Sequence, residues 1–176
     1  YLAECRRRDA GYSLEGRTLA SLNRRMHEWH RDMAAIERIE AIRRRRNGRG
    51  TTAVASDAAW PGLPLADWEW VPSAKEAKAK GERFVVRQLK RAEDLVMESR
   101  AVRHCVSAYA GRCIAGHASI WSLRRCTKDG IDRLLTIEVN ERRRGVQVRG
   151  FANRLAHADE RNVLERWAKA RAIALR

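Results

Sequence analysis

Side chains of the types that bind anions or move protons are concentrated in one stretch of this 176-residue chain, residues 103–153. A histidine and a cysteine, His104 and Cys105, open the stretch, and Tyr109 lies four residues after the cysteine. Three short runs follow in which polar and apolar residues alternate, as they do in β-strands with one buried face. These runs are residues 120–124, 135–139 and 146–150.

If the three runs pair as neighbouring strands, the period of two places their polar residues on one face of the sheet. These residues are Ser122, Arg124, Thr136, Glu138, Gln147 and Arg149, with Asn153 just beyond them. The opposite face is apolar and predicts the core side. A glutamate among arginines can orient Arg124 and Arg149 toward a phosphate. The alternative is a cross-strand salt-bridge ladder that only stabilises the sheet.

His104 and Cys105 fall in a predicted helix over residues 100–114, closed by Gly116. Neighbouring residues on a helix point about 100° apart, so the two side chains do not form a thiolate–imidazolium pair with each other. Cys105 lies on the apolar stripe of this helix, which favours a buried structural cysteine over a nucleophile. His104 lies at the edge of the stripe, and histidine has a pKa suited to general acid or base catalysis.

Metal and cofactor motifs are absent from the sequence. His27 and His30 share a helix face without a third ligand nearby, and the four cysteines form no zinc-finger spacing. The chain has no Walker A loop, no Gly-x-Gly-x-x-Gly turn and no HExxH helix. We therefore predict neither a metal nor a cofactor; a zinc site would need ligands that converge only in the tertiary structure.

A long amphipathic helix is predicted over residues 18–42, where apolar residues recur at spacings of three and four. Four arginines follow, and Asn47 and the nearby glycines end the helix. This arginine run can contact phosphates, or it is a solvated helix end. The run is Arg43, Arg44, Arg45 and Arg46.

The remaining elements are weaker in pattern. Residues 49–56 are typical of a linker, and the Trp- and Pro-rich residues 60–72 predict an extended segment whose tryptophans pack on the next domain rather than stack on bases. Short helices are predicted for 73–80, with Ser73 as N-cap, and for 91–97. Residues 83–89 are compatible with a strand or a loop. A last helix is predicted over 159–175 with an apolar side.

The predicted fold class is α+β: a small antiparallel sheet of three or slightly more strands packed on helices, with helices on one face, preceded by the long N-terminal helix. Three parts follow from this pattern. They are an N-terminal helical arm, residues 1–48; a Trp- and Pro-rich linker and packing segment, residues 49–72; and the α+β domain, residues 73–176.

Charge indicates the class of partner. The chain has 37 Lys plus Arg against 22 Asp plus Glu, a formal net charge of +15. Such a charge attracts polyanions, so nucleic acid is the leading partner and an anionic membrane the second; an arginine-rich proteome would explain part of the excess. No apolar run is long enough to span a membrane, the first residues are too charged for a secretory signal, and the cysteines form no CxxC pair, which favours the cytoplasm. The chain does not begin with Met, which indicates a fragment or a trimmed chain.

The order and spacing of residues over about 95–170 resemble the PcfJ-like family. Its pattern is a His-Cys-Val segment with a following Tyr, a Gly before an Ile-x-Ser-Leu-Arg strand, a Thr-Ile-Glu strand and a Gln-x-x-Gly-x-x-Asn segment. Ser107 departs from the pattern, which usually has Gly there. The matching residues are His104, Cys105, Val106, Tyr109, Gly116, Ile120, Ser122, Leu123, Arg124, Thr136, Ile137, Glu138, Gln147, Gly150 and Asn153.

The resemblance implies a setting in plasmids, phages and other mobile elements, and one constellation of residues. These are His104, Tyr109, Ser122, Arg124, Glu138, Gln147 and Asn153.

Three functions follow as hypotheses. The first is a nucleic-acid-binding accessory protein of a mobile element, with arginines of the arm and sheet on phosphates. The second is an enzyme acting on a phosphodiester or nucleotide, with His104 as acid or base, Glu138 as its partner and Tyr109 beside them. The third is a structural module whose helix 18–42 self-associates or docks a partner protein. The predicted phosphate-binding residues are Ser122, Arg124, Thr136, Gln147, Arg149 and Asn153.

Overall fold

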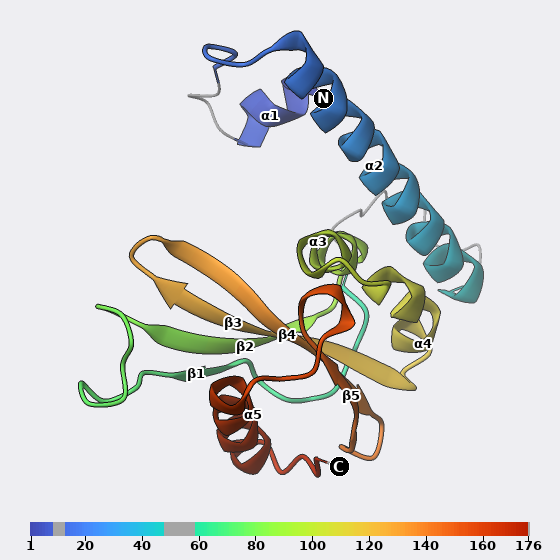
Figure 1. Cartoon of the computed structure of the whole chain (residues 1–176). Helices are drawn as coiled ribbons and strands as arrows, with labels where there is room; N and C mark the ends of the chain where they lie inside the picture. Colours follow the sequence, from blue (N-terminus) through green and yellow to red (C-terminus); the bar gives the residue numbers. More distant parts are fainter. Residues whose placement is uncertain (9–12, 48–58, 176) are drawn as a thin grey trace.

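The computed structural model describes residues 1–8, 13–47 and 59–175, and it confirms the α+β class (Figure 1). A five-stranded antiparallel sheet has its strands in chain order, β1 to β5. The strands are β1 (Trp68–Trp70), β2 (Arg83–Leu89), β3 (Ala118–Thr127), β4 (Gly130–Asn140) and β5 (Gly145–Arg149). The helices are α1 (Leu2–Arg8), α2 (Leu19–Asn47), α3 (Ala92–Val102), the 3-10 turn η1 (Val106–Tyr109), α4 (Ala110–Ile114), the 3-10 turn η2 (Phe151–Asn153) and α5 (Ala158–Ala170).

The three predicted strands correspond to β3, β4 and β5, although β5 ends one residue before the predicted run, and their register places the polar residues as expected. Ser122 pairs with Thr136, which pairs on its other side with Arg149. Two further strands enlarge the sheet. The ambiguous run 83–89 is β2, and the Trp-rich passage contributes the short edge strand β1.

The apolar face of the sheet packs against α5. Trp121, Leu135 and Ile137 have no exposed surface and share a core cluster with Trp167 of α5, whose ring centroid is 5.4 Å from that of Trp121. The predicted apolar side of this helix is confirmed by the burial of Val163, Leu164 and Trp167. The helix ends at Ala170 rather than at residue 175, because the chain turns at Ala172 (φ +50°) to bring Ala174 beside the start of β5.

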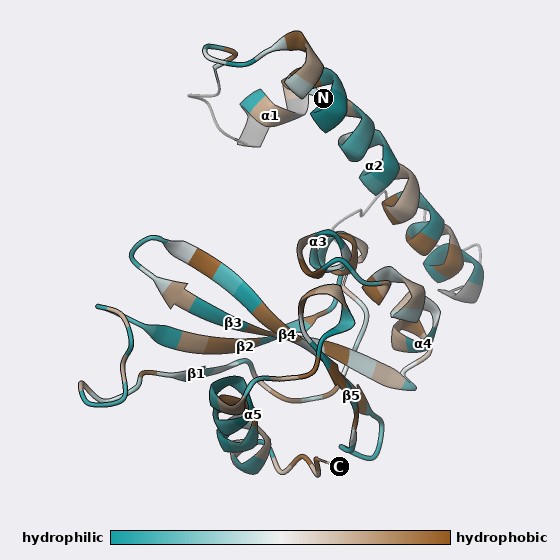
Figure 2. Ribbon diagram, viewed as in Figure 1, coloured by the Kyte–Doolittle hydropathy of each residue, from teal (hydrophilic) through white to brown (hydrophobic). Residues whose placement is uncertain are grey.

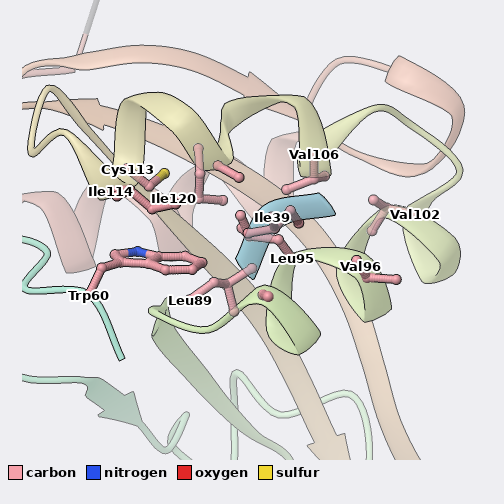
Figure 3. Close-up of a cluster of buried hydrophobic side chains, with 12 residues drawn as sticks. Ile39, Trp60, Leu89, Leu95, Val96, Val102, Val106, Cys113, Ile114 and Ile120 are labelled. Atoms are coloured by element: carbon pink, nitrogen blue, oxygen red, sulfur yellow. The ribbon is translucent and has the colours of Figure 1, made fainter. Parts of the chain in front are cut away.

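Helices also cover the other face of the sheet, so the expectation of helices on one face is wrong. Leu89 and Ile120 interrupt the polar face with apolar side chains, and α3 and α4 pack on them (Figure 3). Trp60 is buried in the same cluster, which confirms packing rather than a free base-stacking ring. The sheet is therefore the middle layer between α5 on one side and α3 with α4 on the other (Figure 1).

The predicted long helix is α2, and its two halves have different surroundings. Its C-terminal half contacts α3 and α4 and carries hydrophobic residues there (Figure 2). Ile39 is 4% exposed and belongs to the core cluster. The N-terminal half extends away from the sheet (Figure 1). Arg100 of α3 forms ion pairs with Glu28 and Asp32 of this half, at 2.8 and 3.0 Å. The predicted linker 49–56 lies outside the described residues.

Two predicted helices differ in the structure. Residues 73–80 form turns, although the Ser73 hydroxyl donates to the Glu76 carboxylate at 2.7 Å as expected of a cap. The predicted helix 100–114 is broken into the end of α3, η1 and α4. No helix among the described residues is long and apolar enough to cross a membrane.

Candidate functional site

A cavity of about 330 Å³ lies between the polar face of the sheet and the broken helical segment above it. Strands β3, β4 and β5 supply its floor, η1 and α4 one wall, and η2 another. We call it the sheet pocket. It is lined by His104, Cys105, Ala108, Tyr109, Arg112, Ile120, Thr136, Glu138, Gln147, Arg149 and Asn153.

The break in the helical segment places His104 and Cys105 at this pocket. Arg103 adopts the left-handed conformation (φ +52°), which ends α3, and the Val106 amide donates to the His104 carbonyl in a tight turn at 2.8 Å. Cys105 is consequently exposed and lines the pocket, so its prediction as a buried structural residue is wrong. Val106 and Cys113 carry the buried stripe instead.

The turn is fixed by a hydrogen bond from the Ser107 amide to the Ser99 hydroxyl of α3, at 2.8 Å. Ser107 is the position at which the sequence departs from the family's usual glycine. The bond uses its backbone amide, so a serine side chain at this position leaves that contact intact.

Glu138 belongs to the pocket floor and is almost fully buried, with 5% of its side chain exposed. Arg112, half exposed on α4, donates to Glu138 Oε1 at 2.6 Å. A buried carboxylate requires such a partner, and the pair in turn fixes the direction of the guanidinium. Glu138 hydrogen-bonds Arg112 and not His104, which had been predicted as its partner.

Tyr109 bridges the wall and the floor. Its hydroxyl donates to Gln147 Oε1 at 2.9 Å, and the guanidinium carbon of Arg112 lies 5.9 Å from its ring centre. Burial, and then the nearby Glu138 carboxylate, raise the pKa of Tyr109. The phenol is therefore protonated near neutral pH and serves as a hydrogen-bond donor.

His104 has an unsatisfied nitrogen. Its Nε2 atom is buried and has no hydrogen-bond partner in the part of the chain that the structure describes. Burial lowers the pKa of His104, because removal from water disfavours the imidazolium form. The imidazole is thus neutral near pH 7.

Arg149 and Asn153 complete the far side of the pocket. Arg149 donates to the carbonyl of Val148 at 3.1 Å and makes no ion pair with the described residues. Asn153 (φ +65°) sits in the η2 turn. A Cβ atom at Gly150 would lie 2.7 Å from the guanidinium carbon of Arg154, so a side chain at this position would displace that guanidinium, which pairs with Glu160.

Ser122 and Arg124 are on the polar face as predicted but do not line the sheet pocket. They lie beneath α3, where Glu98 has no exposed surface and accepts hydrogen bonds from Arg133 Nη1 at 2.8 Å and Thr136 Oγ1 at 3.1 Å. Arg124 is 3.9 Å from the same carboxylate and donates to Ser122 Oγ at 3.1 Å. Arg124 therefore belongs to a buried ion cluster that joins α3 to the sheet through Glu98, rather than to a cross-strand ladder with Glu138.

Three important residues were missed by the sequence reasoning. Cys105 was assigned to the core, and Arg112 was not considered, although it follows Tyr109 by three residues and so shares its helical side. Glu98 also had a recognisable signal. It lies three residues after Leu95 and four before Val102, on the apolar stripe of α3, where a carboxylate needs a buried partner.

The basic arm ends beside α4, the helix that carries Arg112 (Figure 1). Arg43 pairs with Glu40 at 2.8 Å, and Arg44 and Arg45 are exposed. The side chain of Arg46 lies outside what the structure describes. Within the described residues, no three His, Cys, Asp or Glu side chains group as a metal site.

The model of the PcfJ-like protein family matches residues 21–164. The chain belongs to this family. The match covers more than the resemblance seen in the sequence, because it begins within α2 and includes the whole sheet pocket. No curated protein and no solved structure matches this PcfJ-like chain.

Proposed function

We propose that this PcfJ-like protein is a nucleic-acid-binding accessory protein of a plasmid or phage that acts in the cytoplasm, with a phosphate or nucleotide held in the sheet pocket. The observation that carries the proposal is Arg149. It lines a concave site without a carboxylate partner among the described residues. A phosphate is the ligand that best matches a guanidinium without a carboxylate partner beside amide and hydroxyl groups.

The other lining residues support the same ligand. Arg112 is held by Glu138 and keeps donors for a second phosphate oxygen, since a guanidinium has five N–H groups. Gln147 and Asn153 offer amide donors, and the phenol of Tyr109 is a further hydrogen-bonding group in the pocket. The net charge of +15 attracts a polyanion from a distance.

The arm extends this surface. Exposed Arg44 and Arg45 at the end of α2, next to α4, provide further phosphate contacts outside the pocket. Such contacts position a nucleic acid without reading its sequence.

Fluorescence anisotropy with single-stranded and duplex DNA and RNA across about 50 to 200 mM salt tests the proposal. We expect affinity to fall as salt rises, and R149Q to weaken binding and reduce the slope of log K against log salt by about one. The matched control is R91Q, which removes an exposed arginine at the start of α3. Affinity that is independent of salt, or equal losses in both variants, would contradict binding through the pocket.

The second candidate is an enzyme that acts on a phosphodiester or nucleotide. The observation in its favour is the buried, unpartnered Nε2 of a neutral His104, which can accept a proton. The protonated Tyr109 can donate one, and Arg112 and Arg149 stabilise developing negative charge.

This candidate predicts a separation of turnover from binding. H104N and E138Q should abolish any turnover of labelled oligonucleotides or nucleotides, whereas H104N should leave affinity within about threefold, because His104 makes no charged contact. Parallel loss of turnover and affinity in H104N would speak against a general base.

A further inference from the structure

A second cavity, of about 430 Å³, lies on the opposite side of the sheet from the sheet pocket. The turns of residues 73–82, strands β1 to β4 and the start of α5 line it. We call it the α5 pocket. Although the chain carries a net charge of +15, the lining of this pocket has four carboxylates and two cationic side chains. The carboxylates are Glu76, Glu82, Asp159 and Glu160, and the cations are Lys78 and Arg125.

Three of the four carboxylates already hold a cation. Glu76 pairs with Arg166 at 3.0 Å and Asp159 with Lys78 at 2.8 Å. Glu160 pairs with Arg154 and also accepts from the His157 amide at the start of α5. These acids are therefore satisfied within the fold.

Glu82 is different. It is 3% exposed, and its Oε2 atom accepts one hydrogen bond, from the Lys78 amide at 2.7 Å. Its Oε1 atom accepts none from the described residues, and no cation pairs with the carboxylate. Lys78 reaches Asp159 instead. Arg125 donates to Asp132 through two nitrogens, at 2.7 and 3.2 Å, and attracts Glu82 only over a longer range, without a direct ion pair.

The strand direction points this carboxylate into the cavity. Glu82 precedes β2, and the period of two places it on the same side as Phe84 and Val86, the side that faces α5. A buried carboxylate without a cation is costly, and an external cation would relieve that cost.

Besides the polar residues His157 and Asn162, the rest of the lining is apolar or aromatic. Trp70 stacks on Phe84 with ring centroids 5.5 Å apart, and the guanidinium of Arg166 lies 4.6 Å from the centre of the Trp70 ring. Leu134 and Val163 add aliphatic surface. The site thus combines one free carboxylate with walls that suit a short hydrocarbon chain.

We propose that the α5 pocket binds an organic cation, an ammonium or guanidinium group on a short apolar stem, with Glu82 as its counter-ion. Two sources carry this chemistry: a free amine and a basic side chain of a peptide. The site is separate from the sheet pocket and independent of the function proposed for it.

Isothermal titration of the full chain with agmatine, which carries a guanidinium and an ammonium on a butyl stem, tests the proposal. Butylurea, which is neutral, is the matched control ligand, and a capped Gly-Arg-Gly peptide represents the side-chain source. We expect saturable binding of agmatine, of the peptide or of both, and none of butylurea. Because the protein is strongly cationic, non-specific attraction works against this result.

Two variants locate the site. E82Q keeps the acceptor for the Lys78 amide but removes the charge, and we expect it to weaken binding about tenfold or more. D159N changes an exposed residue at the pocket, where folding is not at risk, and should weaken binding roughly twofold. Oligonucleotide affinity should be unchanged in both.

No binding of either cation up to about 10 mM would overturn the proposal. So would unchanged affinity in both variants, with urea unfolding showing that each is folded. If agmatine binds, a small free amine is a sufficient ligand for the α5 pocket. If only the peptide binds, the ligand is a basic side chain of a peptide.

Discussion

Burial of His104 beside the sheet pocket makes the stability of the protein depend on pH. Its pKa in the folded chain lies below the usual value of 6.5 because of burial, so the unfolded chain takes up the proton more readily. The contribution of neutral His104 to the stability of the folded chain is therefore complete above about pH 6.5, and it is lost as the pH falls below that value. We expect H104Q to flatten the decrease in the free energy of unfolding between about pH 7.5 and 5.5, measured with urea.

The control for this prediction is H117Q, which changes an exposed histidine close in sequence. It should retain the pH dependence of the wild type. If H104Q and the wild type lose the same free energy between the two pH values, His104 is not the group responsible.

The two cysteines at the pocket end of the molecule should differ sharply in reactivity. Cys105 is exposed, whereas burial, and then the Glu138 carboxylate, raise the pKa of Cys113 to about 12. At pH 8 the thiolate fraction of Cys113 is lower than that of an ordinary cysteine by roughly three orders of magnitude. We expect C105S to remove a fast phase of reaction with a disulfide reagent and C113S to leave it unchanged. Because Cys5 is also partly exposed, both variants are made in a C5S background, where a fast phase that survives C105S would show that Cys105 is not the reactive thiol.

For single residues, the sequence predicted correctly which strand side chains share a face of the sheet. The period of two correctly grouped Thr136, Glu138, Gln147 and Arg149, since alternation along a strand is a local property. It could not show which part of a sheet face a helix covers, so Arg124 was placed with the pocket although α3 buries it. Cys105 was misplaced because Arg103 takes a left-handed conformation without the glycine that normally signals one.

Among the elements, α3 is joined to the sheet by one buried carboxylate, Glu98. Its removal would leave Arg133 and Arg124 without their counter-ion. We expect E98A to lower the free energy of unfolding by about 3–5 kcal/mol, because breaking a buried ion pair leaves an uncompensated charge. E37A, at an exposed glutamate of α2, should cost under about 0.5 kcal/mol in the same urea titration. Similar small losses in both would show that the cluster contributes little.

The existence of a helix was predictable where a hydrophobic period is long, whereas helix ends and elements that depend on tertiary contacts were not. The stripes of α2 and α5 were visible in the sequence, and both helices exist. The short charged run 73–80 has a cap but too few residues to form a helix by itself, so it remains a set of turns. Strand β1 exists because Trp68 and Trp70 pair with the edge of β2, a partner that no local pattern reveals.

At the scale of the whole molecule, α2 is anchored to the core through its C-terminal half. Ile39 is buried with residues of α3 and α4 (Figure 3). We expect I39A to cost about 2–4 kcal/mol of unfolding free energy, the usual range for a buried isoleucine. I42A, three residues on and 44% exposed, should cost less than about 1 kcal/mol. Equal costs would mean that the arm does not belong to the core.

The net charge of the molecule opposes its own folding, and salt should relieve this. Exposed pairs such as Lys78–Asp159 and Arg166–Glu76 each contribute a fraction of a kcal/mol, so their screening by salt costs little. Repulsion among the excess cations acts over the whole surface, and a Debye length of about 8 Å at physiological ionic strength suppresses it. We therefore expect the melting temperature to rise by about 2–4 °C between low and physiological salt, which corresponds to ~1 kcal/mol.

The β4–β5 turn allows a direct test of this cause. Arg142, Arg143 and Arg144 are exposed there, and replacing all three with Gln lowers the formal charge from +15 by three to +12. This variant should melt higher than the wild type at low salt and gain less from added salt, as followed by circular dichroism. A melting temperature that falls with salt in the wild type would show that specific ion pairs outweigh the general repulsion. In that case ion pairs such as Glu98–Arg133 would stabilise the protein by more than the repulsion among its excess cations destabilises it.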